Sequence, residues 1–120
     1  MRMDRTGERA LIVDDDPGLR RLFQRYFHSL GWTADAVSGG LEALEAFGAA
    51  TYRVVVCDVN LGAGDGIQTA KKLRDMQPSL RVVIASGLPD NIDRARAAGF
   101  GHCLRKPFTL DELKTAIGGA

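Results

Sequence analysis

Five short runs with strand-like composition alternate along the chain with five segments whose apolar residues recur at helical spacing. We expect strands at residues 10–13, 33–37, 54–57, 81–85 and 102–104. The run at 54–57 is continuously apolar, which is typical of a strand buried on both faces of a parallel sheet. Strict alternation of strands and helices predicts an open α/β sheet with helices on both faces. Right-handed crossovers then place the carboxyl ends of all the strands at one edge.

The helical segments carry start signals that can be recognised in the sequence. Asp16 followed by Pro17 predicts an N-cap and a first helical turn, and Gly31 ends that helix. Thr109 precedes Glu112 by three residues, the spacing of a capping box. We expect Leu41, Leu44 and Phe47 to lie on one face of the second helix. The fourth helix is expected at about residues 92–98.

Length and charge restrict the classes of function. The 120 residues are enough for one domain, and 16 basic against 15 acidic residues leave a net charge of +1. This charge gives no electrostatic reason to expect direct binding to nucleic acid or to an anionic membrane. No apolar run approaches the roughly 20 residues of a membrane span, and residues 1–8 contain no apolar leader. Cys57 and Cys103 are expected to be free, buried thiols, which indicates a reducing, cytoplasmic location.

Polar side chains follow four of the five expected strands. The residues directly after the strands are Asp14, Asp15, Asp16, Asp58, Ser86 and Lys106. Ligands of open α/β sheets bind at this edge, so we expect several of these side chains to converge. Taken singly, each of these residues could instead be an ordinary loop, capping or surface residue with no role in a site. Asp16 in particular is expected to cap the first helix. The glycine-rich stretch 62–66 is expected to be a turn, and His28 and His102 are expected to be structural or surface residues.

Converging carboxylates need a counter-charge. Two unit charges about 4 Å apart repel by about 4 kcal/mol at an effective dielectric of 20. Mg²⁺ prefers oxygen ligands and commonly uses one or two carboxylates together with phosphate oxygens. Three carboxylates, one Mg²⁺ and Lys106 sum to zero, which suits a site that accepts a phosphoryl group. An aspartate at such a site can act as a nucleophile and form an acyl phosphate.

The motifs, in their order and spacing, resemble the receiver domain of bacterial two-component response regulators. The matching stretches are Leu11-Ile12-Val13-Asp14-Asp15-Asp16-Pro17, Val55-Val56-Cys57-Asp58, Asp65-Gly66, Ala85-Ser86-Gly87 and Lys106-Pro107-Phe108. The resemblance covers about residues 9–117 and implies a single receiver domain over residues 1–120. It also implies a doubly wound, flavodoxin-like fold, with five parallel strands in the order 2-1-3-4-5 and five helices.

The resemblance assigns a role to each site residue. Asp58 would be the phosphoacceptor and a metal ligand, with Asp14 and Asp15 as the acidic pair and Asp15 as the more direct ligand. The backbone carbonyl of Asn60 would be a further ligand of Mg²⁺, for which Mn²⁺ can substitute. The phosphoryl group would be bound by Ser86, the switch hydroxyl, and by Lys106, and the bond from Lys106 to Pro107 is expected to be cis.

Two positions depart from the family pattern. Receivers usually carry Tyr or Phe three residues before the lysine, where this chain has Cys103. The aromatic side chain that normally moves inward with the hydroxyl is therefore missing, although the phosphorylation chemistry is intact. The proline that often follows the phosphoacceptor by four positions is replaced by Gly62, which makes the loop more costly to order.

The resemblance implies a phosphoacceptor switch and not an enzyme beyond its own phosphorylation and dephosphorylation. The expected partners are a sensor histidine kinase or a histidine phosphotransfer protein, and an unidentified downstream protein. One alternative is a pseudo-receiver that binds proteins without being phosphorylated. Another is an aspartate-nucleophile phosphohydrolase, whose Asp-x-Asp opening Asp14 and Asp16 superficially match. A flavin-binding protein is disfavoured because three acids after the first strand would repel the flavin phosphate.

Overall fold

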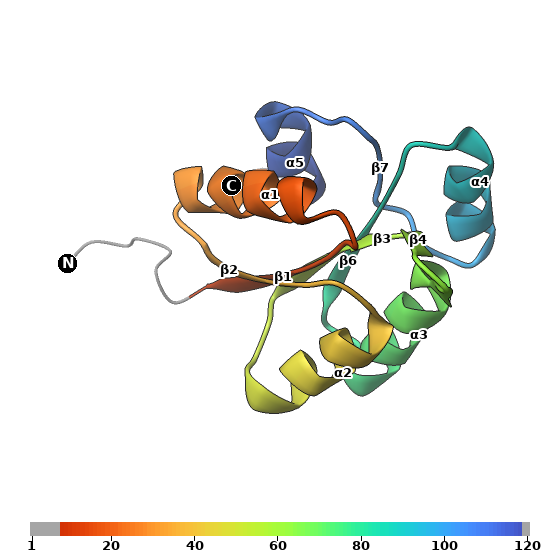
Figure 1. Cartoon of the computed structure of the whole chain (residues 1–120), viewed down its shortest axis with the longest axis horizontal. Coiled ribbons are helices and arrows are strands. Elements are labelled where there is room, and N and C mark those ends of the chain that lie inside the picture. The colour runs from red at the N-terminus through yellow and green to blue at the C-terminus, as the bar shows by residue number, and fades with distance from the viewer. Residues whose placement is uncertain (1–7, 119–120) are drawn as a thin grey trace.

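Five parallel strands form one sheet in the computed structural model, which describes residues 8–118. The strands are β1 (Arg9–Val13), β2 (Thr33–Val37), β3 (Val54–Asp58), β6 (Arg81–Ser86) and β7 (Cys103–Arg105). They lie in the order β2-β1-β3-β6-β7, and every neighbouring pair is parallel (Figure 1). Numbered along the chain within this sheet, that order is 2-1-3-4-5, so the predicted fold is confirmed.

Five helices cover the two faces of the sheet. Helices α1 (Pro17–Ser29) and α5 (Leu110–Ala116) pack on one face, and α2 (Gly40–Ala49) and α3 (Gly66–Met76) on the other (Figure 1). Helix α4 (Pro89–Ala97) contacts β6 and β7 and contributes Ala95 to the core on the α2–α3 side. None of the described helices is long and apolar enough to cross a bilayer.

The predicted start signals of the first and last helices are present. The carboxylate of Asp16 accepts hydrogen bonds from the backbone N–H groups of Gly18 and Leu19, with Pro17 in the first turn. Thr109 and Glu112 form a reciprocal capping box at the start of α5. These bonds satisfy backbone donors that have no partner within the helix, and each cap typically contributes about 1 kcal/mol.

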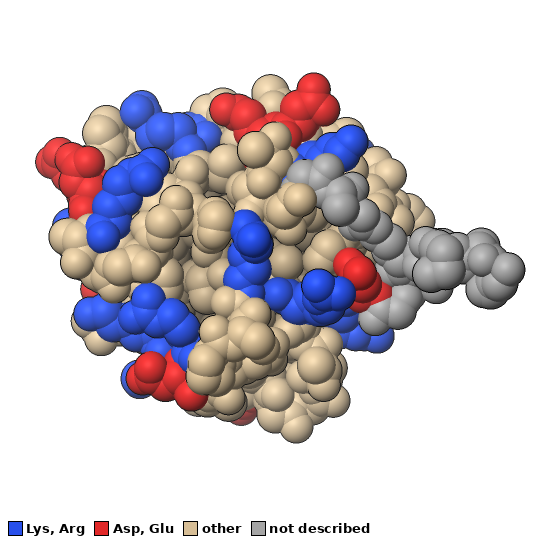
Figure 2. Space-filling view, turned by 180° about the vertical axis from the view of Figure 1, so that it is seen from behind, with Lys and Arg blue, Asp and Glu red and all other residues tan. Residues whose placement is uncertain are grey.

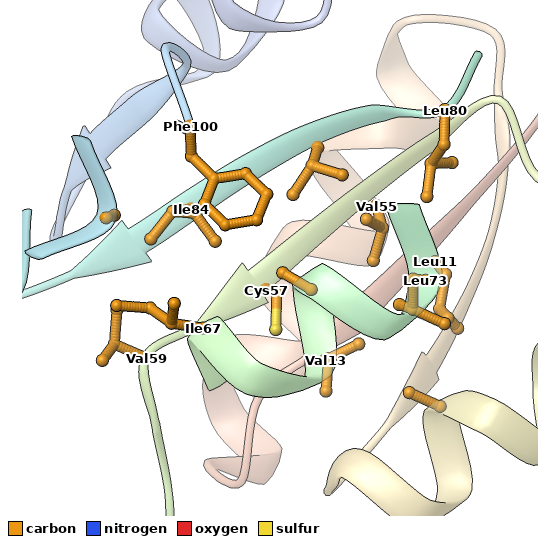
Figure 3. Close-up of a cluster of buried hydrophobic side chains, with 14 of the residues drawn as sticks. Leu11, Val13, Val55, Cys57, Val59, Ile67, Leu73, Leu80, Ile84 and Phe100 are labelled. Carbon is orange, nitrogen blue, oxygen red and sulfur yellow. The ribbon is translucent and has the colours of Figure 1, made fainter. Parts of the chain in front are cut away.

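The central strand β3 fixes where the site lies. All five of its residues are buried, and its apolar side chains enter both core clusters. Figure 3 shows Cys57 under α3, among Val59, Ile67 and Ile84. Asp58 ends the strand in register with Ala85 of β6, so the residues after neighbouring strands lie side by side at one edge.

Several local predictions were wrong in detail. The glycine-rich stretch is not a simple turn, because β4 (Asn60–Leu61) pairs with β5 (Gly64–Asp65) in a small antiparallel hairpin. Helix α4 begins at Pro89 and not near residue 92, since the proline itself supplies the first turn. Strand β7 lies one residue later than expected.

Two side chains are less buried than the sequence predicts. Leu41 does not face inward with Leu44 and Phe47, because it lies in the first turn of α2 and is 68% exposed. Cys103 is partly buried and not fully buried, because it lies on an edge strand. Both cysteines are free, as expected. The prediction that residues 1–8 contain no apolar leader concerns residues that, apart from Glu8, lie outside the described part of the chain, as do residues 119 and 120.

The first residue of α3 must be glycine. The N–H group of Gly66 donates to the carbonyl of Val59 over 2.7 Å, and a Cβ atom at Gly66 would overlap the carbonyl oxygen of Asp58. The atoms that an added Cβ would meet belong to the backbone of Asp58 and Val59, at the end of the buried strand β3. They cannot turn aside as a flexible side chain would. The start of α3 is therefore fitted closely against the chain beside Asp58.

We predict that Gly66→Ala lowers the free energy of unfolding by about 3 kcal/mol or more, because the added methyl group forces the backbone apart. Gly48→Ala is the matched control, since Gly48 is exposed near the end of α2 and has nothing within 4 Å of an added Cβ. It should raise stability by up to about 1 kcal/mol. Urea unfolding measures both, and equal effects of the two substitutions would contradict the close fit.

Candidate functional site

Three carboxylates converge at the carboxyl edge of the sheet. Asp14 and Asp15 follow β1, and Asp58 ends β3; one oxygen from each lies within 4.8 Å of the others. Asp14 and Asp58 are buried, whereas Asp15 is exposed. The arrangement offers a hard cation two oxygens from inside the protein and one from the solvent side, and the donors are all of the kind that Mg²⁺ prefers.

Lys106 joins the two buried carboxylates. Its Nζ lies 3.1 Å from Oδ2 of Asp14 and 3.2 Å from Oδ2 of Asp58. The lysine side chain is only 16% exposed, so water screens these ion pairs weakly. Burial by itself lowers the pKa of Lys106, but the charges and hydrogen bonds of the two aspartates outweigh it and raise the pKa above its usual value. The lysine is therefore charged at neutral pH.

Asp58 lies in an environment that disfavours its negative charge. Burial raises the pKa of Asp58, and the neighbouring charge of Asp14 raises it further. Lys106 and a backbone hydrogen bond from Asn60 lower it, without cancelling the increase. Lys106 therefore offsets only part of the cost of burying this carboxylate beside Asp14, and a divalent cation would offset the rest.

Asp14 is held in place by its local backbone. Its Oδ1 accepts from the N–H group of Asp16 over 2.9 Å, and its carbonyl accepts from the guanidinium group of Arg20 over 2.8 Å. Oδ2 is the oxygen that meets Lys106. Asp16 itself caps α1 and is not part of the cluster, as the sequence predicted.

Ser86 lies at the same edge but bonds to α4. It is buried at the end of β6, and its Oγ accepts from the backbone N–H of Leu88 and from Nδ2 of Asn91, both over 3.1 Å. Among the described residues it forms no hydrogen bond with Asp14, Asp58 or Lys106. The structure therefore places the expected switch hydroxyl beside the cluster and not within it.

The loop after Asp58 contains the other expected ligand. Asn60 is exposed and opposes Asp65 in the small hairpin. Gly62 has a φ of +61°, and a Cβ atom there would lie 3.9 Å from Oδ2 of Asp15. The hairpin thus adjoins the exposed carboxylate of the cluster, while the ligand role of the Asn60 carbonyl stays a prediction.

The expected cis bond between Lys106 and Pro107 is present. Three residues earlier, Cys103 donates a weak hydrogen bond from Sγ to the carbonyl of Phe100 over 3.5 Å. Its side chain packs against the core cluster on the α2–α3 side of the sheet. The position that carries an aromatic side chain in the family pattern is thus filled by a small, partly buried thiol.

Sequence reasoning missed three polar side chains near the site. Asn91 is buried in α4 and bonds to Ser86, and Arg94 connects Asn91 to Asp65 at the start of α3. One signal was available: Asn91 is a polar residue one turn before Ala95 on the inward face of a short helix. The interpretation of this segment as beginning at residue 92 excluded it.

A doubly wound parallel sheet with an acidic cluster and a partly buried lysine at its carboxyl edge defines a flavodoxin-like fold. The sequence model of the response regulator receiver domain matches residues 10–118, so the chain belongs to that family. Members of this family are signalling switches of two-component systems, and they bind Mg²⁺ at an acidic aspartate cluster such as the one formed by Asp14, Asp15 and Asp58.

The chain is similar to curated proteins of several architectures. It is 35% identical to the sensor protein EvgS of Escherichia coli K12 over 109 residues, which are 89% of this chain but 9% of that protein. It is 36% identical to the two-component response regulator ARR22 of Arabidopsis thaliana, covering 87% of this chain and 77% of that protein. It is 31% identical to sporulation initiation phosphotransferase F of Bacillus subtilis, covering 92% of this chain and 90% of that protein.

Solved structures show the same fold. A CheY-like receiver domain from Methylobacillus flagellatus superposes with a TM-score of 0.84 at 29% identity, covering 93% of this chain and 97% of that one. The response regulator TrrA of Thermotoga maritima was solved in complex with Mg²⁺ and BeF. It has a TM-score of 0.83 at 26% identity, covering 93% of this chain and 97% of that one.

The raised pKa of Asp58 predicts an effect on stability. When a carboxyl group has a higher pKa in the folded than in the unfolded state, the folded protein loses stability as pH rises from the unfolded pKa through the folded pKa. In EDTA at neutral pH, Asp58→Asn should therefore raise the free energy of unfolding.

Urea unfolding with and without Mg²⁺ measures this effect. Mg²⁺ should stabilise the wild type more than Asp58→Asn, so the difference between their free energies of unfolding should become smaller. Asp75→Asn is the control, because Asp75 is exposed on α3 away from the cluster, and it should change stability by less than about 0.5 kcal/mol. A destabilised Asp58→Asn protein in EDTA would contradict the electrostatic account.

Proposed function

We propose that this chain is a phosphoacceptor switch in which Asp58 receives a phosphoryl group from a phosphohistidine. One observation carries the proposal: Lys106 bridges the buried Asp14 and Asp58, while Asp15 completes a cluster of three carboxylates. The four side chains sum to a charge of −2. This charge matches a divalent cation, and the neutral site that results matches an incoming phosphoryl group.

Mg²⁺, or Mn²⁺ in its place, would be held by Asp14, Asp15, Asp58 and the backbone carbonyl of Asn60. When bound, the cation neutralises charge on phosphoryl oxygens as they approach the carboxylates. The residues fit this role because one oxygen of each carboxylate lies within 4.8 Å of the others, and because a carboxylate oxygen can accept from more than one partner.

Asp58 is the nucleophile of the proposed transfer. One of its carboxylate oxygens forms a bond to phosphorus as the bond from phosphorus to the imidazole nitrogen of the donor breaks. The electron pair of the broken bond returns to that imidazole. Hydrolysis later restores the carboxylate, when a water oxygen attacks phosphorus and inorganic phosphate leaves. β3 holds the carboxylate in place, since the strand is buried along its whole length.

Lys106 and Ser86 respond to the new group. Phosphorylation replaces one negative charge at Asp58 by a group with about two, so the buried ammonium of Lys106 gains a stronger partner. Ser86 has a hydroxyl proton with no acceptor among the described residues, and it would donate this proton to a phosphoryl oxygen. These two movements favour the active arrangement of the surface around β6, α4 and β7.

The proposed partners are proteins. A sensor histidine kinase or histidine phosphotransfer protein supplies the phosphoryl group, and an unidentified protein reads the switched surface. On the face in Figure 2, Lys and Arg side chains are separated by acidic and uncharged ones and do not form one continuous basic surface. This mixture, with a net charge of +1, suits a protein partner better than nucleic acid. We further propose that residues 1–120 form a single receiver domain that acts in the cytoplasm.

Acetyl phosphate with Mg²⁺ should add one phosphoryl group to the chain, detected by intact mass. Asp58→Asn should gain none, because the amide cannot form the acyl phosphate. Lys106→Ala should fold but accept the group at least about tenfold more slowly, since a buried positive charge at the site is lost.

Beryllofluoride distinguishes fast hydrolysis from absence of the reaction. If no adduct accumulates but beryllofluoride binds in a manner that depends on Mg²⁺ and Asp58, the phosphoryl group forms and is lost quickly. Absence of both the adduct and beryllofluoride binding would contradict the proposal and favour a pseudo-receiver that binds its partner without phosphorylation.

A further inference from the structure

The hydroxyl group of Ser86 is held away from the acidic cluster by α4. Its oxygen accepts from the backbone N–H of Leu88 and from the side-chain amide of Asn91. Asn91 is only 8% exposed, so its amide has little access to water as an alternative partner. If the hydroxyl moves to a phosphoryl group on Asp58, the amide of Asn91 loses its acceptor inside the protein, which is unfavourable.

Asn91 of α4 is connected through Arg94 to the start of α3. Its Oδ1 accepts from Nη1 of Arg94 over 3.3 Å, and Nη2 of the same guanidinium lies 3.0 Å from Oδ2 of Asp65. The connected side chains are therefore Ser86, Asn91, Arg94 and Asp65, and they run from the end of β6 through α4 to the start of α3.

Asp65 is itself tied to the phosphoacceptor strand. Its Oδ1 accepts from the N–H of Ile67 as the N-cap of α3, and its Oδ2 is the oxygen that meets Arg94. The next residue, Gly66, donates to the carbonyl of Val59, directly after Asp58. One carboxylate thus connects the side-chain network to the start of α3, where the backbone is fitted closely against β3.

We propose that Asn91 is a positioning residue that couples Ser86 to Arg94 and Asp65, so that phosphorylation changes the start of α3 as well as α4. The inference rests on the proposed function, because the phosphoryl group is what draws Ser86 away. It also explains how a chain with Cys103 in place of an aromatic side chain can transmit the change: the connection runs through polar side chains on the α3–α4 side.

The test is NMR of the full chain, labelled with ¹⁵N, before and after addition of Mg²⁺ and beryllofluoride. In the wild type, the backbone signals of Asp15 and Val59 should shift and report occupation of the cluster. Signals of Arg94 and Ile67 should shift with them and report the coupling. Absence of shifts at Asp15 and Val59 would contradict the proposed function itself, and the coupling with it.

Two variants break the network at different points. Asn91→Ala and Arg94→Gln should retain the shifts at Asp15 and Val59, but should reduce the shift at Ile67 to less than half. Arg96→Gln is the matched control, because Arg96 lies exposed on the same helix and makes no hydrogen bond or ion pair with another described side chain. An Ile67 shift that is unchanged in both Asn91→Ala and Arg94→Gln would overturn the proposal.

Asn91→Asp separates positioning from a merely structural role. The carboxylate keeps an acceptor for Arg94 and also accepts a hydrogen bond from the hydroxyl of Ser86, so the hydroxyl is no longer free to donate to a phosphoryl oxygen. Asn91→Asp should therefore bind beryllofluoride about tenfold more weakly than the wild type, whereas Asn91→Ala should bind it at least as tightly. Equal weakening in the two variants would show that Asn91 only supports the fold, and would overturn the proposal.

Discussion

The ammonium group of Lys106 between the carboxylates of Asp14 and Asp58 is the interaction on which the site depends. Two buried carboxylates at neighbouring strand ends would repel each other strongly without it. Lys106 offsets part of this repulsion, and it does so from a third strand end, after β7. The fold therefore brings together charges that a further cation would balance, and burial together with Asp14 keeps the pKa of Asp58 raised despite Lys106.

The sequence alone predicted an open parallel sheet and the side chains of the cluster, for a physical reason, whereas the order of the strands came from the family resemblance. In a parallel α/β fold, all strand ends meet at one edge, so reading the residue after each strand locates the site without any distance information. Local rules were similarly reliable where short-range bonds decide the structure, as at the Asp16 cap and the Thr109–Glu112 capping box. The ligand and phosphoacceptor roles of the cluster came from the family resemblance and are proposals.

Features that depend on tertiary contacts could not be read from the pattern. Leu41 has the spacing of a core residue, but its position in the first turn of α2 leaves it in solvent. The hairpin of β4 and β5 is two residues long on each side, too short for alternation to be recognised. Asn91 is polar and yet buried, and only the position of Ser86 beside it explains why. The hairpin adjoins the cluster and Asn91 bonds to Ser86 beside it, so the sequence predicted the chemistry of the site better than the contacts around it.

A crystal structure of the protein with Mg²⁺ and beryllofluoride would show whether Asp58 is the acceptor of a site that binds Mg²⁺. We predict beryllium bonded to a carboxylate oxygen of Asp58 and Mg²⁺ held by oxygens of Asp14, Asp15 and Asp58. We also predict that Lys106 contacts a fluorine atom and that the Ser86 hydroxyl has left Asn91. Beryllofluoride bound elsewhere, or a site in which Lys106 still bridges Asp14 and Asp58 with no cation beside them, would contradict this prediction.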